Sequence, residues 1–155
     1  MKRSVTIELL EEHKNATFYT LRFTDEADSE FEKFWAKFSK SHSVDCHLLS
    51  YWMERIGNEG TSHPFFRDEG GVFVKAIPFQ PSNLRLYCYI IERTFLLFGG
   101  GGKKNTRTFQ DDPILNEQVN FVRKTGNKIL RYLDKDKIMV DGNKLTGKLT
   151  FDIKL

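Results

Sequence analysis

Cationic and aromatic side chains gather in one stretch of the chain, residues 84–109 (LRLYCYIIERTFLLFGGGGKKNTRTF). Arg85, Tyr87 and Tyr89 alternate with apolar residues at its start. After four glycines, cations return at Lys103, Lys104 and Arg107. RNA can be cleaved without a metal when the phosphorane charge is neutralised and the leaving oxygen receives a proton. Arginine, lysine and tyrosine can supply both effects. Tyrosine rings could instead stack on RNA bases.

The same residues also have a simpler interpretation. Exposed lysines and arginines are common on any protein surface, and Arg85 could simply pair with an acid. The net charge of +3 and the pI of about 8.8 permit a nucleic-acid partner without requiring one. The position of these cations in the fold therefore decides between the two interpretations.

The alternation in this stretch predicts an antiparallel hairpin at the centre of a sheet. One face of the first strand is apolar and is expected to be core, with Leu84, Leu86, Cys88 and Ile90. The other face is expected to present the arginine and the two phenols. Residues 94–98 suit a strand covered on both faces. We expect Gly99 to Gly102 to release the chain from the sheet, so that the following cations converge with Arg85 on one concave surface.

A helical hairpin is predicted before this centre. Ser29 and Glu32 have capping-box spacing, and the apolar residues of the helix that they begin are Phe31, Phe34, Trp35 and Phe38. Ser43 can cap a second helix, which we expect to end at Gly57. The segment Phe65-Phe66-Arg67 then leads to a strand at Val72–Ile77.

Further elements are predicted at both ends of the chain. Alternating residues predict an N-terminal β-hairpin at about 4–24, and Asp141-Gly142 predicts a C-terminal β-hairpin at about 137–154. Asp112 and Pro113 can begin a long helix that ends near Asp134, with Gly126 on its apolar stripe close to the sheet.

The order of elements, ββ, αα, βββ, α, ββ, predicts an α+β fold. We expect an antiparallel or mixed central sheet, with the helices gathered on one side, in a single domain of residues 1–155. One core is expected to contain Phe31, Phe34, Trp35, Phe38, Trp52, Leu86, Cys88, Leu96 and Phe98.

Several other kinds of site do not fit the sequence. The glycine run lacks the spacing of a Walker A loop and of a dinucleotide fingerprint, so no nucleotide cofactor is expected. Cys46 and Cys88 lack metal spacing with the histidines, so we expect buried, reduced thiols and no metal. The chain has no apolar run of about 20 residues, which predicts a cytoplasmic protein without a membrane partner.

The segment from Leu84 to Arg107, followed by Asp111-Asp112-Pro113 and a helix, resembles the second half of RelE/HigB-like type II toxins. These proteins have a Leu-Arg-x-Tyr/Phe-x-Tyr strand, an apolar strand, a loop with paired lysines, and a terminal helix. The corresponding residues here are Leu84-Arg85-Leu86-Tyr87-Cys88-Tyr89, Phe95-Leu96-Leu97-Phe98, Lys103-Lys104-Asn105-Thr106 and the helix from Pro113.

The resemblance implies a metal-independent endoribonuclease that cleaves mRNA on the ribosome and is neutralised by a cognate antitoxin, of the helix-turn-helix type. Arg85 would act on the scissile phosphate, and Tyr87 and Arg107 would be the other catalytic residues. RNA would be held by Lys103, Lys104, Tyr89 and Arg67. The alternative is a noncatalytic module on the same scaffold that binds nucleic acid or a protein segment.

Overall fold

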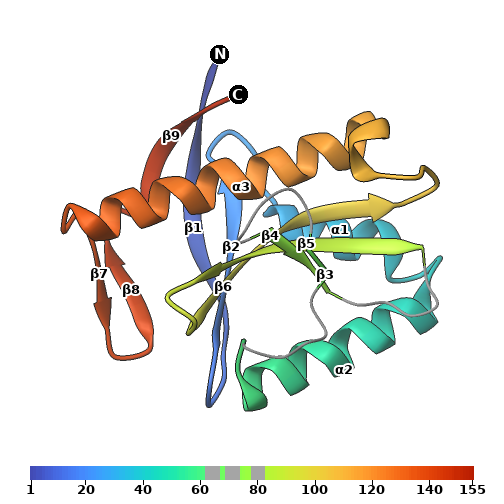
Figure 1. Cartoon of the computed structure of the whole chain (residues 1–155), viewed down its shortest axis with the longest axis horizontal. Helices are drawn as coiled ribbons and strands as arrows, with labels where there is room; N and C mark the ends of the chain where they lie inside the picture. The colour runs from blue at the N-terminus through green and yellow to red at the C-terminus, as the bar shows by residue number, and fades with distance from the viewer. Residues whose placement is uncertain (62–66, 69–73, 78–82) are drawn as a thin grey trace.

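The structure is a computed structural model that describes residues 1–61, 67–68, 74–77 and 83–155 (Figure 1). Its elements are β1 (Lys2–Glu12), β2 (Thr17–Phe23), α1 (Glu30–Phe38), α2 (Ser43–Glu59), β3 (Arg67–Asp68), β4 (Val74–Ala76), β5 (Leu84–Ile91), β6 (Phe95–Lys103), a 3-10 turn (Phe109–Asp111), α3 (Pro113–Asp134), β7 (Ile138–Asp141), β8 (Lys144–Gly147) and β9 (Thr150–Lys154). The predicted residues Phe65, Phe66, Val72 and Pro78 lie outside the described residues.

The described strands form a mixed sheet in the order β3-β4-β5-β6-β2-β1-β9. Strands β2 and β6 run parallel, and the other neighbours are antiparallel. This arrangement confirms the α+β class with a mixed sheet. The C-terminal hairpin is smaller than predicted, because only β7 and β8 pair around Asp141 and Gly142. Strand β9 instead joins the main sheet beside β1.

Helices α1 and α3 begin with the predicted side-chain caps. The Ser29 side chain accepts a hydrogen bond from the Glu32 backbone N–H (3.1 Å), and the Glu32 carboxylate accepts one from Ser29 (3.0 Å), which confirms the capping box. Asp112 caps α3 in the predicted way, with Pro113 in the first turn.

The predicted Ser43 cap of α2 is wrong, because Ser43 is the first residue of the helix and the cap residue His42 makes no side-chain hydrogen bond to it. Helix α2 also does not end at Gly57. It continues to Glu59, and the backbone N–H of the following Gly60 donates to the Ile56 carbonyl.

The helices cover both faces of the sheet, so the expectation that they gather on one side is wrong. On one face, α3 packs against Tyr87, Tyr89 and Leu97. On the other face, α1 and α2 pack against Leu86, Cys88 and Phe98. Figure 1 shows α3 along one side of the sheet and α2 on the opposite side. Both faces of β5 are therefore interior, and each carries its own hydrophobic core.

The nine predicted core residues do share one cluster. Of these, Phe34, Phe38, Leu86, Cys88, Leu96 and Phe98 are buried, and Phe31, Trp35 and Trp52 are partly buried against them. The first helix and the inner face of the central hairpin were thus correctly oriented from their spacing. The second cluster, beneath α3, was not predicted.

The four glycines do not release the chain from the sheet, because they are part of β6. Gly101 pairs with Leu86 and Gly102 with Arg85. A β-carbon on Gly101 would lie 1.8 Å from the Arg85 carbonyl oxygen, and one on Gly100 would lie 2.6 Å from the Gln118 amide oxygen on α3. Glycine is required here because backbone and helix side chains approach the strand too closely for any side chain.

Both cysteines are free and buried, as predicted, and burial raises the pKa of both thiols. Because only the thiolate reacts readily, we expect Cys46 and Cys88 in the native protein to react with an aromatic disulfide reagent roughly 100-fold more slowly than in denaturant. The measurement is the absorbance over time of the aromatic thiolate that the reagent releases. Denatured protein should release two equivalents with or without prior reductant, and rapid reaction of the folded protein would contradict the burial.

Candidate functional site

The two predicted RNA-contacting tyrosines lie inside the protein. Tyr87 is 0% exposed and Tyr89 is 1% exposed, both beneath α3. The Tyr89 hydroxyl donates a hydrogen bond to the Asn127 amide oxygen on α3 (2.6 Å), and burial raises its pKa. The Tyr89 ring lies against Gly126, where a β-carbon would be 2.3 Å from Cγ, which confirms the predicted close approach. In this structure neither ring can stack on a base.

Arg85, the main predicted catalytic residue, is also largely buried. It is 8% exposed, and its guanidinium donates to the Leu84 carbonyl (2.9 Å). It lies on the same face of β5 as the two tyrosines, the face that α3 covers. The expected face with an arginine beside two phenols is therefore interior, because α3 packs over it.

The remaining predicted site residues lie in different environments. Lys103 and Arg107 are exposed, at the end of β6 and in the following loop, and Lys104 is half-buried. The backbone of Arg67 pairs with Ala76, and its side chain lies outside the described part of the structure. The structure thus places Lys103 and Arg107 at the surface and Arg85 in the interior. It does not bring all the predicted cations together on one concave surface.

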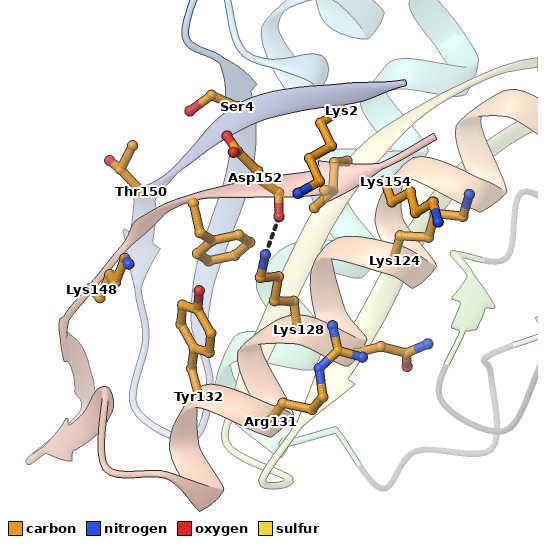
Figure 2. A pocket seen from close by; sticks show the side chains of 13 residues that line it. Lys2, Ser4, Lys124, Lys128, Arg131, Tyr132, Lys148, Thr150, Asp152 and Lys154 are labelled. Carbon is orange, nitrogen blue, oxygen red and sulfur yellow. Dashed lines mark hydrogen bonds between the residues drawn. The ribbon is translucent and has the colours of Figure 1, made fainter.

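A different set of cations lines a groove between α3 and β9, with a volume of about 720 Å³. Figure 2 shows this groove, with Lys128 extending from α3 toward β9. Its cationic residues are Lys2, Lys124, Lys128, Arg131, Lys148 and Lys154. Asp152 is the single acid among the described residues that line it. The lining therefore carries a formal charge of +5, compared with +3 for the whole chain.

The spacing of residues on α3 and β9 brings these cations together. Lys124, Lys128 and Arg131 follow one another at helical intervals, on one side of the buried stripe that includes Ile129. On β9, Phe151 and Ile153 are buried and the alternate residues are exposed. Because β9 pairs with the N-terminal end of β1, Lys2 lies directly opposite Lys154 in the sheet.

Aromatic rings form the floor of the groove and hold its central lysine. Tyr132 on α3 meets Phe151 on β9 edge to face, with ring centroids 5.3 Å apart. The Lys128 ammonium lies 5.6 Å from each of these ring centroids and donates to the Asp152 backbone carbonyl. This is a favourable cation–π position, and it fixes one positive charge over an apolar floor.

The cations of the groove form no ion pair with a carboxylate among the described residues. Arg3, Arg22, Lys33, Arg55 and Lys144 each form an ion pair with a carboxylate. Among the residues that the structure describes, none of the six groove cations does so. Six positive charges along one groove, with no carboxylate partner in the described part of the chain, favour an anionic ligand with several charges.

Comparisons with models of protein families, with curated proteins and with solved structures find no match to this chain. Within the described ranges, no three His, Cys, Asp or Glu side chains are placed to hold a metal ion. The same part of the chain contains no helix that is long and apolar enough to cross a membrane. The arguments for function therefore rest on the groove itself.

The groove was not predicted, although three of its six cations follow a recognisable pattern in the sequence. Lys124, Lys128 and Arg131 occupy positions i, i+4 and i+7 of a predicted helix, which indicates a cationic stripe. The contribution of Lys2, Lys148 and Lys154 had no such signal, because it depends on β9 pairing with β1 rather than with the neighbouring hairpin.

Proposed function

We propose that this protein binds RNA through its phosphate backbone, in the groove between α3 and β9. The observation that carries the proposal is the set of six groove cations, none of which has a carboxylate partner among the described residues. Binding a polyanion at such a surface releases condensed counterions, which drives association without reading sequence. This matches the noncatalytic binding module, one of the two functions expected from the sequence.

The geometry of α3 supports a ligand with several phosphates. Lys124 and Arg131 are seven residues apart, about 10 Å along a helix with a rise of about 1.5 Å per residue. Tyr132 and Phe151 are buried in the floor, so the accessible groups are mainly amines and a guanidinium. We therefore propose contacts to the backbone rather than stacking on bases, with little preference for sequence. A cytoplasmic location, where RNA is abundant, belongs to the same proposal.

The toxin-like ribonuclease stays a second proposal. Its support is the exposure of Lys103 at the end of β6 and of Arg107 in the loop that follows. The burial of Arg85 weighs against it, because a group that stabilises the scissile phosphate must touch it. Its partners would be mRNA, the ribosome and a cognate antitoxin. It is tested by ribosome-programmed mRNA cleavage, where wild-type cleavage that falls roughly 100-fold in Arg85→Ala would favour this proposal.

The binding proposal is tested by the salt dependence of affinity. Fluorescence anisotropy with a labelled single-stranded RNA oligonucleotide gives Kd between about 50 and 200 mM salt. We expect a linear fall of log affinity with log salt, with a slope of about −3 to −4 if roughly five phosphates are neutralised. Lys128→Gln should flatten the slope, whereas Lys40→Gln, an exposed lysine outside the groove, should not. No binding at low salt, or equal effects of the two variants, would contradict the proposal.

A further inference from the structure

A second cavity, of about 480 Å³, opens between α1, α2 and the end of β1. It belongs to the layer of helices on the face of the sheet opposite α3, so it is separate from the cationic groove. Its lining combines two aromatic rings, two carboxylates and an imidazole with a few neutral side chains. These residues are Phe31, Trp35, Glu11, Glu54 and His13, with Ser50, Met53 and Asn58. None of the described residues that line it is a lysine or an arginine.

The aromatic wall of this cavity is formed by one turn of α1. Phe31 and Trp35 lie at i and i+4, with ring centroids 6.0 Å apart and planes only 19° from parallel. Both rings are half-buried, and Phe31 meets the core residue Phe98 edge to face at 5.8 Å. The wall is therefore anchored in the core. Aromatic faces carry negative electrostatic potential and attract cations.

The histidine in the lining is held rigidly between the sheet and α2. The His13 ring lies 4.7 Å from the ring of Phe18 and directly over Gly57, where a β-carbon would be 2.2 Å from Cγ. The Asn15 backbone N–H donates to the Gly57 carbonyl (2.8 Å), which fastens the β1–β2 turn to α2. The close approach of the His13 ring explains why a glycine occupies position 57 inside α2. The cavity is thus preformed rather than dependent on a mobile loop.

The two carboxylates give the cavity a negative charge. The Glu11 carboxylate oxygen Oε2 lies 3.4 Å from His13 Nε2. The imidazole offsets the charge of Glu11 only when it is protonated. Glu54 is exposed on α2 and makes no ion pair among the described residues. In a chain whose net charge is +3, a cavity with two carboxylates and no cation in its described lining differs in sign from the rest of the molecule. Its complement is a cation.

We propose that this cavity binds a guanidinium group, either on a small molecule or on an arginine side chain of a partner. A guanidinium is planar, so it can stack on the Phe31 and Trp35 wall while its edge donates hydrogen bonds to Glu11 and Glu54. An ammonium lacks this flat face. The combination of an aromatic wall and two carboxylates therefore selects a guanidinium.

The test is isothermal titration calorimetry of the whole protein with Nα-acetyl-argininamide at low salt. The control ligand is Nα-acetyl-citrullinamide, which has nearly the same shape but replaces the guanidinium with a neutral urea. We expect the arginine compound to bind with a Kd of about 1 mM and the citrulline compound at least roughly tenfold more weakly. Equal affinity for the two compounds, or no detectable binding of the arginine compound, would overturn the proposal.

Variants locate the binding on the protein. Glu54→Gln and Glu11→Gln should each weaken binding of Nα-acetyl-argininamide by roughly fivefold or more, because each removes a charged acceptor. Glu117→Gln removes the same charge from an exposed site on α3 and should leave the affinity unchanged. Both Glu11 and Glu54 are exposed, so the folded state should tolerate these changes. Unaltered binding in both pocket variants would overturn the assignment.

A capped Gly-Gly-Arg-Gly-Gly peptide distinguishes the two sources of the guanidinium. Peptide binding at least as tight as that of the amide, and weakened by Glu54→Gln, would assign the cavity to an arginine of a partner segment. Binding of the amide but not of the peptide would assign it to a small molecule. RNA binding should be the same in Glu54→Gln as in wild type, so failure of either proposal is recognised independently of the other.

Discussion

Replacing Lys124, Lys128 and Arg131 together with glutamine is expected to lower RNA affinity by roughly 100-fold or more at low salt. The three side chains form the α3 wall of the groove, and they have no carboxylate partners among the described residues. Their removal should therefore cost phosphate contacts without leaving an acid unpaired. The slope of log affinity against log salt should also flatten by about 2 units, since each lost contact to a single strand contributes about 0.7.

The matched control is a second triple variant, in which Lys103, Lys104 and Arg107 become glutamine. It removes the same charge from the end of β6 and the loop after it, where the sequence predicted RNA binding by Lys103 and Lys104 and a catalytic role for Arg107. We expect it to change affinity by less than about fivefold, because long-range attraction between exposed charges is largely screened beyond a Debye length. The opposite ranking of the two variants would move the RNA site to this loop.

The largest expected loss of stability comes from Gly101→Ala. A β-carbon at Gly101 would lie 1.8 Å from the carbonyl oxygen of Arg85, an atom of the neighbouring strand that no rotamer change can move. The pairing of β5 with β6 is already irregular at this point. We expect the free energy of unfolding to fall by roughly 3 kcal/mol or more. Urea unfolding followed by tryptophan fluorescence measures this change.

Gly102→Ala, one residue further along β6, is the control for this effect. Its β-carbon would lie 3.1 Å from a terminal methyl of Leu115, which can shift slightly. We expect a change in the free energy of unfolding of about 1 kcal/mol or less. If both variants unfolded at the wild-type urea concentration, the glycines would not be required by close packing, and the description of β6 would be wrong.

The residues that were placed correctly from sequence are those governed by local chemistry. The capping box of Ser29 and Glu32, the cap at Asp112 and the two-residue alternation along β5 each depend on neighbours within one turn or strand. The core beneath α1 followed for the same reason, since the spacing of Phe34 and Phe38 fixes which side of the helix is apolar.

The errors have a common cause in long-range packing. The alternation along β5 predicts that Tyr87 and Tyr89 lie on a face that presents them to a ligand, and only the position of α3 over β5 makes that face interior. The sequence predicts that the four glycines release the chain from the sheet, whereas they continue β6, and at Gly100 and Gly101 the neighbouring helix and strand leave no room for a side chain. The groove required β9 to pair with β1, which no local pattern of residues indicates.

The most direct test of the RNA site is the effect of bound RNA on backbone amide hydrogen exchange, measured by mass spectrometry. At saturating RNA, we predict slower exchange in the segments that line the groove, residues 124–132 of α3 and β9 with the adjoining start of β1. Exchange in residues 103–108 should be unchanged. Slower exchange confined to residues 103–108, with no change along α3 and β9, would contradict the proposal that the groove is the RNA site.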